Sequence, residues 1–229
     1  MKNMRIEQPK SLAAMVADRL RRAIVDGELS LGENISEEKM AENFGVSRTP
    51  VRDALALLQQ QGLVTVQSKR GSFVFTPTVE DVTRLCEYRK MLETGTVRIA
   101  VERDKAALLE RLSATVEAMR PAMAAGDAVA YGRLDTEFHQ AFFDCSGNAY
   151  VSQAYELVSG QIAALRTHLT RPVAALRETS FDEHRLFVEF VAREDFTGFE
   201  ALMARHVDRT GDVYLEALRK ESAPLDNGA

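Results

Sequence analysis

Residues 42–55, with the sequence ENFGVSRTPVRDAL, decide the fold of the first part of the chain. The segment reads as the end of a short helix, a turn at Gly45, and a second helix that Ser47 caps. The first turn of that second helix is polar, and apolar residues recur on one face further along. This order of elements predicts a helix-turn-helix.

The sequence on both sides of this segment completes a small domain. Apolar residues at helical spacing predict helices over 11–26, 37–44 and 48–61. The period then changes from 3.6 to 2, so that residues 63–66 and 73–75 predict two strands around a turn at 68–71. Three helices followed by a β-hairpin are typical of a winged helix-turn-helix.

From residue 79 onward the sequence has only helical periodicity. The predicted helices span 79–103, 104–125, 128–146, 149–170, 180–194 and 196–221, with breaks at 126–127, 147–148 and 171–172. This pattern predicts a helical bundle. We therefore expect a mainly α protein: a winged helix-turn-helix domain over 1–76, an all-helical domain over 77–222, and a disordered tail over 223–229.

The composition suits a globular protein, since 45% of the 229 residues are hydrophobic and 28% are charged. No apolar run reaches the roughly 18–20 residues that cross a bilayer, and residues 1–10 contain no apolar signal segment. Two cysteines, Cys86 and Cys145, fit a reducing compartment. We expect a cytoplasmic protein without a membrane partner.

The net charge of −5 is distributed unevenly along the chain. Residues 1–76 have a net charge of +2, and residues 77–229 have a net charge of −7. The small positive surplus of the first part permits contact with DNA phosphates, whereas the second part has no electrostatic reason to approach DNA.

Basic and small polar residues gather at two predicted positions of the first domain. The candidate DNA-contacting residues are Ser47, Arg48, Thr49, Arg52, Lys69, Arg70 and Gly71. Arg48 and Arg52 lie four residues apart on one helix face, where each can bind a guanine edge or a phosphate. The hairpin tip can reach a minor groove. An isolated surface arginine is usually only solvated, but the combination favours DNA binding.

These motifs resemble the GntR family of bacterial regulators. The resemblance rests on LGE at 31–33, SEE at 36–38, GVSRTPVRDAL at 45–55 and GLV at 62–64. It implies a winged helix that binds a palindromic operator in double-stranded DNA, as a homodimer. Some relatives have an arginine where this chain has Glu38, so operator details do not transfer.

The four histidines of the chain suggest a second site. Asp135 and His139 lie four residues apart on one predicted helix, while His184 and His206 lie on two later helices. One carboxylate and three imidazoles suit Zn²⁺, Ni²⁺ or another borderline divalent ion. A single helical histidine is more often an ordinary core or surface residue, so the spacing alone leaves this open.

Residues 79–215 resemble the all-helical FCD domain of the FadR subfamily. The matching pieces are YRKMLE at 88–93, DTEFH at 135–139, SGN at 146–148, EH at 183–184 and MARH at 203–206. The resemblance implies that Asp135, His139, His184 and His206 bind a divalent metal, and the number of helices suggests the shorter, VanR-like branch. Relatives that bind metal typically sense small organic acids.

A carboxylate effector needs cationic partners beside the metal. Arg89 and Arg166 are the candidates, although Arg89 also has Glu93 one helical turn away as an internal ion-pair partner. His168 has no matched role. We therefore expect a transcriptional regulator, more often a repressor than an activator, whose operator affinity responds to a small carboxylate at a metal site.

Two other functions fit the same residues. One is a metalloenzyme with an accessory DNA-binding head, because a divalent ion with open positions can activate water. The sequence offers no convincing general base or known catalytic motif for it, so we do not expect an enzyme. The other is a constitutive DNA-binding protein with a purely structural metal.

Overall fold

The computed structural model describes residues 11–170 and 173–222. The chain divides into two compact units, with the boundary between Thr76 and Pro77. The predicted tail over 223–229 and the predicted break at 171–172 lie outside the described residues.

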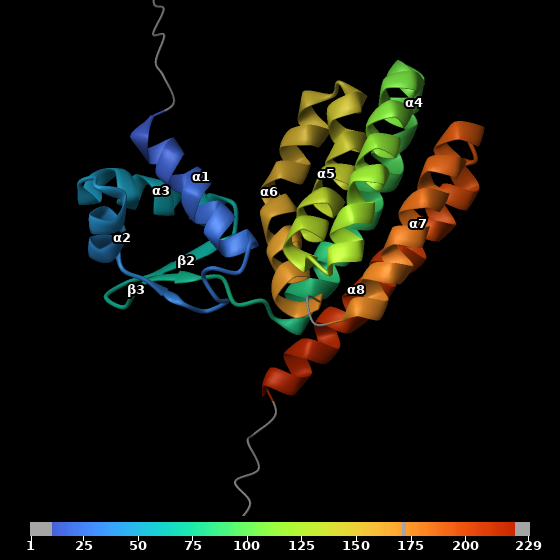
Figure 1. The fold of residues 1–229 in the computed structure, drawn as a ribbon. Helices are drawn as coiled ribbons and strands as arrows, with labels where there is room; N and C mark the ends of the chain where they lie inside the picture. The colour runs from blue at the N-terminus through green and yellow to red at the C-terminus, as the bar shows by residue number, and fades with distance from the viewer. Residues whose placement is uncertain (1–10, 171–172, 223–229) are drawn as a thin grey trace, which may run out of the picture. The chain divides into compact units, whose positions relative to one another are not determined.

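Over residues 11–76, the first unit contains three helices and a three-stranded sheet (Figure 1). Its elements are α1 (Leu12–Val25), β1 (Asn34–Ile35), α2 (Glu37–Phe44), α3 (Arg48–Gln60), β2 (Val64–Gln67) and β3 (Gly71–Val74). The sheet is antiparallel in the order β1-β3-β2. Leu20 and Ile24 of α1 and Leu55 and Leu58 of α3 are fully buried, so the packing of α1 on α3 forms the core of this unit.

Local chemistry explains where these helices begin and end. The Ser11 hydroxyl accepts a hydrogen bond from Ala14 N at the start of α1, 3.1 Å away. Gly45 ends α2 with a φ of 65°, a left-handed conformation that glycine adopts without steric cost. α3 then begins two residues after Val46, which gives the short turn of a helix-turn-helix.

The predicted winged helix-turn-helix is confirmed, with one strand more than the sequence suggested. β1 consists of two residues that pair with Ser72 and Phe73 of β3. A strand this short has no periodic pattern, so its pairing depends on a tertiary contact that sequence periodicity does not reveal.

Over residues 77–170 and 173–222, the second unit contains helices and no strand. Its elements are α4 (Val79–Ala125), α5 (Ala128–Ser146), α6 (Ala149–Leu165), the π-helical turn η1 (Arg166–Thr170), α7 (Ala174–Arg193) and α8 (Phe196–Ser222). Thr78 and Asp81 form a reciprocal capping box at the start of α4. The break predicted after residue 103 appears as a kink within α4, where Asp104 has non-helical φ and ψ angles of −160° and 83°.

α4 packs against α5, α7 and α8, and these helices run side by side in Figure 1. Their buried faces form one apolar cluster that includes Phe138, Phe142, Phe187, Phe199 and Met203. The phenylalanine rings contact one another edge-on or tilted, as between Phe142 and Phe199 with centroids 5.5 Å apart. This packing fixes the helices that carry the polar cluster described below.

Two boundaries differ from the sequence prediction. α7 begins at Ala174 rather than at residue 180, because residues 174–179 have good helix formers and Leu176 is buried. The helix predicted over 149–170 ends as an α-helix at Leu165 and continues as the π turn η1. Among the residues that the structure describes, no helix combines the length and apolar character needed to cross a membrane.

Two glycines inside helices give opposite predictions for stability. A Cβ atom added at Gly198 would lie 2.5 Å from Phe190 Cε1 and 2.7 Å from Asp195 Oδ2, whereas one added at Gly95 would meet nothing within 4 Å. We expect Gly198→Ala to destabilise the bundle by about 1–3 kcal/mol because of overpacking. Gly95→Ala should stabilise it by about 0.5–1 kcal/mol because alanine favours the helix.

Urea unfolding of the two variants, followed by circular dichroism, measures both effects. Equal transition midpoints for the two variants would contradict the packing described around Gly198.

Candidate metal and nucleic-acid sites

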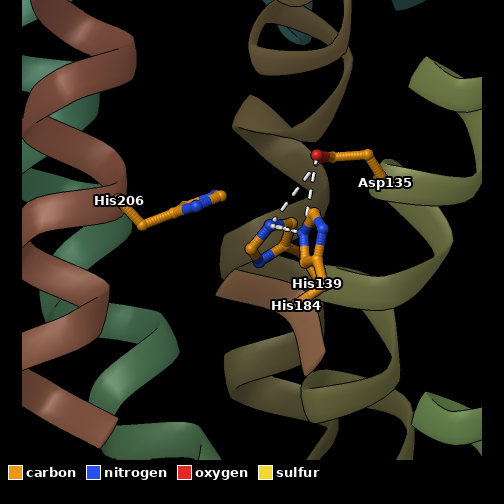
Figure 2. Close-up of side chains that lie close together, drawn as sticks. All are labelled: Asp135, His139, His184 and His206. Carbon is orange, nitrogen blue, oxygen red and sulfur yellow. Dashed lines mark hydrogen bonds and ion pairs between the residues drawn. The ribbon is translucent and has the colours of Figure 1, made fainter. Parts of the chain in front are cut away.

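Four buried polar residues from three helices meet inside the second unit (Figure 2). Asp135 and His139 come from α5, His184 from α7 and His206 from α8. All four are at least 96% buried. Each offers one potential ligand atom, and these atoms all lie within 4.8 Å of one another.

The distances within the cluster match those of donors around one ion. His139 Nε2 and His184 Nε2 are 3.4 Å apart, and they lie 3.7 Å and 3.5 Å from Oδ2 and Oδ1 of Asp135. Donors at tetrahedral positions on Zn²⁺, with bonds of about 2.0–2.1 Å, are separated by about 3.3–3.4 Å. A small contraction would therefore bring these three donors to bonding distance.

Glutamates outside the cluster orient two of the imidazoles. His139 Nδ1 donates to Glu93 Oε2 at 2.6 Å, and His206 Nδ1 donates to Glu183 Oε2 at 2.7 Å. Because Nδ1 carries the proton in each case, the Nε2 lone pair faces the cluster. This carboxylate–histidine arrangement is typical of metal sites, where it fixes the tautomer and raises the basicity of the ligand.

The imidazoles are held in the neutral form that binds metal. Burial lowers the pKa of His184 to about 3, and it also lowers the pKa of His139 and His206. His184 Nδ1 lies 3.4 Å from the hydroxyl of Tyr131, so this imidazole also has a polar partner on its outer side. Neutral imidazoles need no deprotonation before they bind a cation.

The ionisation and contacts of the Asp135 carboxylate show whether these residues fit a metal ion. Burial alone would raise the pKa of its carboxyl, but Arg166 holds it well below the usual range. Arg166 Nη2 lies 2.5 Å from Asp135 Oδ2, yet this buried oxygen has no hydrogen bond of acceptable geometry. Asp135 is therefore an ionised carboxylate paired with Arg166, and together with three neutral imidazoles it provides a donor set that suits a divalent cation.

Arg89 is a buried cation at the edge of the cluster. Its Nε donates to Glu93 Oε1 at 2.5 Å, and its Nη2 donates to His139 Nε2 at 2.8 Å. The internal ion pair with Glu93 that the sequence raised for Arg89 is therefore present, and a role of Arg89 toward an effector stays a prediction. The nearby Glu93 carboxylate raises the pKa of Arg89, which stays charged although it is buried.

A cavity of about 470 Å³, part of it open to solvent, adjoins the cluster. It is lined by Arg89, Ala128, Tyr131, Gly132, Asp135, Arg166, Thr167, Thr170, Leu176, Arg177, Ser180, His206 and Thr210. The cavity combines two of the predicted metal ligands with both predicted effector arginines.

The predicted DNA-contacting residues of α3 are exposed at its N-terminus. Ser47 is the N-cap residue by position, but its side chain makes no capping hydrogen bond. Arg48 and Arg52 share one carboxylate partner, since their Nη2 atoms lie 3.4 Å and 3.1 Å from Glu37 Oε2. The hydrogen bond from Arg52 lowers the pKa of Glu37, so this carboxylate stays charged beside both arginines.

The remaining predicted contacts lie in the exposed turn between β2 and β3. Lys69 has a φ of 63°, and Gly71 has a φ of 110°. The φ of Gly71 favours glycine, and a Cβ atom there would also lie 3.2 Å from Asn34 Nδ2, so that this side chain would have to shift. The turn thereby exposes Lys69 and Arg70 at the tip of a narrow hairpin.

Several residues that shape the polar cluster were missed by sequence reasoning. Glu183, Tyr131 and Arg209 had no assigned role, and Glu93 was considered only as a partner of Arg89. Little in the sequence indicated a role for Glu183. It precedes His184 directly, but adjacent residues of a helix point in different directions, and the Glu183 carboxylate binds His206 of another helix. His168 lies in η1, outside the cluster.

A winged helix-turn-helix followed by a helical bundle is an architecture of DNA-binding transcriptional regulators. Residues 12–74 match the sequence profile of "Bacterial regulatory proteins, gntR family", and residues 84–209 match that of the FCD domain. The chain therefore belongs to the GntR family of DNA-binding transcriptional regulators, in the group with an FCD domain. It is a regulator and not an enzyme.

Individual relatives agree with this family. The chain is 29% identical over 210 residues to the HTH-type transcriptional regulator LutR of Bacillus subtilis, covering 83% of this chain and 95% of LutR. It is 26% identical over 207 residues to the gluconate operon transcriptional repressor of the same organism, covering 88% and 83%. The fold resembles a putative GntR regulator from Rhodococcus sp. RHA1, with a TM-score of 0.79, 24% identity, and coverage of 90% and 98%.

Glu93 allows a test of the cluster as a metal site. Glu93→Gln replaces the charged acceptor of His139 Nδ1 by a neutral amide, so zinc affinity should fall by about 10–100-fold. Glu87→Gln makes the same change at an exposed position of the same helix and should leave zinc affinity unchanged. Competition with a chromophoric chelator measures the affinity, with circular dichroism as the check that both variants are folded.

Proposed function

We propose that this regulator is a repressor whose operator affinity depends on a small organic acid bound beside a divalent metal ion. Asp135, His139, His184 and His206 hold the ion in this proposal. The observation that carries it is the convergence of one carboxylate and three neutral imidazoles within 4.8 Å, next to a cavity lined by arginines. Regulators named as repressors among the relatives support the direction of control.

In this proposal the two parts of the chain have different functions. Residues 1–76 bind DNA, and residues 77–222 bind the metal and the effector. The contacts with DNA come from the N-terminal turn of α3 and the hairpin tip, namely Ser47, Arg48, Thr49, Arg52, Lys69, Arg70 and Gly71. Their exposure supports this assignment. A homodimer would present two such surfaces to the two halves of a palindromic operator.

Zinc or nickel is the proposed ion. Imidazole nitrogens with one carboxylate suit borderline divalent ions better than Mg²⁺ or Ca²⁺, which prefer oxygen donors. The glutamates bonded to His139 and His206 support the same choice, because they strengthen nitrogen donors. A four-residue set also leaves coordination positions for an oxygen of the effector when the ion adopts five or six ligands.

Arg89 and Arg166 are the proposed effector-binding residues. Both line the cavity, and a guanidinium can donate two parallel hydrogen bonds to a carboxylate. One relative is named for a gluconate operon, and gluconate is itself a carboxylate. The effector would control DNA binding only through a difference in its affinity for two arrangements of the protein.

The DNA-contacting residues can be tested by single substitutions. Arg48→Ala and Arg52→Ala should each weaken operator binding by about 1–3 kcal/mol if the arginines contact bases. Arg22→Ala removes the same charge from an exposed position of α1 and should have little effect. Fluorescence anisotropy with a labelled operator at fixed salt measures all three, and equal losses for the three variants would leave only a non-specific charge effect.

The metal and effector are tested by the response of DNA binding to added acids. Zinc-loaded protein should lose operator affinity by about 5–150-fold when a suitable small carboxylate is added. His206→Ala should bind operator but not respond, because its metal site lacks a ligand. His168→Ala, a histidine of the same unit outside the cluster, should respond normally.

A protein that binds operator equally well with zinc, without zinc and with every acid in the panel would contradict this function. Thermal melting then tests the alternative of a constitutive DNA-binding protein with a purely structural metal. In that protein zinc would raise the melting temperature, and added acids would not raise it further.

A further inference from the structure

We propose that Arg89 takes the place of the metal ion in the metal-free protein. Its guanidinium uses the lone pair of His139 Nε2, and a bound ion displaces it from that atom. This inference rests on the metal site of the proposed function, and it gives Arg89 a role before any effector binds. Two observations carry it: a ring of hydrogen bonds that includes His139, and a different arrangement of a second arginine at His206.

Arg89, Glu93 and His139 form a closed ring of three hydrogen bonds. Glu93 accepts from Arg89 Nε through Oε1 at 2.5 Å, and from His139 Nδ1 through Oε2 at 2.6 Å. Arg89 Nη2 donates to His139 Nε2 at 2.8 Å and thereby closes the ring. The three side chains are at most 4% exposed, so bulk water does not compete for these contacts.

The contact with Arg89 determines which nitrogen of His139 accepts. A guanidinium has only N–H donors, so His139 Nε2 must accept and the imidazole proton must lie on Nδ1. The unprotonated nitrogen of an imidazole has a single lone pair, which is also the one that binds a metal ion. His139 Nε2 therefore cannot accept from Arg89 and bind the ion at the same time.

Repulsion between the two cations acts in the same direction. Arg89 Nη2 lies 2.8 Å from an atom that a zinc ion would approach to about 2.0–2.1 Å. Like charges at such short range repel strongly inside a protein, where water does not screen them. Binding of the ion thus requires Nη2 to leave His139. The contact of Arg89 Nε with Glu93 can remain, because it uses a different nitrogen.

A second arginine, glutamate and histidine have the same order of contacts but form no ring. Arg209 donates to both carboxylate oxygens of Glu183, and Glu183 Oε2 accepts from His206 Nδ1. The other hydrogen bond that the structure describes for Arg209 goes to the hydroxyl of Ser180 rather than to an imidazole. Arg209 therefore supports a proposed metal ligand without competing for its lone pair, which makes it a matched control for Arg89.

The displaced Arg89 Nη2 needs a new acceptor, because an unpaired buried donor is costly. Arg89 lines the cavity beside the cluster, where the space open to a water-sized molecule is about 30 Å³. This is room for about two water molecules, so water can accept from the freed nitrogen without a larger rearrangement. The carboxylate of an effector would then replace this water, so binding of the ion precedes the proposed role of Arg89 toward the effector.

The zinc affinities of two variants test the displacement. Arg89→Gln removes the competitor for His139 Nε2, so the full chain should bind zinc about tenfold or more tightly than the wild type, the effect of one hydrogen bond to a charged group. Arg209→Gln should bind zinc no more tightly than the wild type. Competition with a chromophoric chelator measures the affinities, and circular dichroism checks that both variants are folded.

NMR of the arginine side chains in the unaltered protein follows the guanidinium itself. In metal-free protein the Nη2 protons of Arg89 should exchange slowly with water, because a buried nitrogen accepts from them. One equivalent of zinc should speed up this exchange, while the Nε proton held by Glu93 should stay slow. This measurement needs no variant, so it decides the question even if Arg89→Gln does not fold.

The outcomes separate this inference from the proposed function. A zinc affinity that is unchanged in Arg89→Gln, or raised equally in both variants, would overturn the displacement. Slow Nη2 exchange that persists with zinc bound would also overturn it, since a gain in affinity would then reflect only the removal of a nearby charge. A wild-type chain that binds no zinc would overturn the metal site of the proposed function as well.

Discussion

Compensation of buried charge is the constraint on which the helical unit depends. Six ionised groups lie in or beside the cluster, and each is paired with a group of opposite sign on the same or a neighbouring element. Buried ion pairs contribute little net stability compared with apolar packing, because desolvation offsets the attraction. Their presence within an otherwise phenylalanine-rich core therefore argues for a binding role rather than a structural one.

The paired charged groups also form hydrogen bonds between different helices. Glu93 of α4 holds His139 of α5, and Glu183 of α7 holds His206 of α8, so each glutamate fixes a donor that belongs to another helix. An ion bound by the three imidazoles and Asp135 would connect α5, α7 and α8 at one point. Any ligand that alters the coordination of that ion would thereby act on several helices at once, which is the geometric requirement for a switch.

The sequence predicted the fold well where the pattern was periodic, and less well where tertiary contacts decided. The helix-turn-helix segment and its flanking helices have strong caps and clear apolar faces, and the resemblance to GntR regulators was specific. β1 was missed because two residues cannot show a period. The start of α7 was placed too late because the predicted break near 171–172 was extended over residues 174–179, which are good helix formers. Placement in the shorter, VanR-like branch stays a prediction.

For the polar site too, sequence spacing predicted contacts within one helix but not contacts between helices. The spacing of Asp135 and His139 puts both on one face of α5, which a sequence alone can reveal. The roles of Glu183 and Glu37 could not be found this way, because each side chain meets residues 11 to 26 positions away on another helix. Glu37 also bears on the proposed DNA contacts, because its carboxylate is the ion-pair partner of both Arg48 and Arg52. If these arginines contact DNA as proposed, operator binding would exchange one set of ion partners for another. In that exchange, the loss of the Glu37 ion pairs would offset a small part of the free energy gained from each arginine–DNA contact, because exposed ion pairs contribute little.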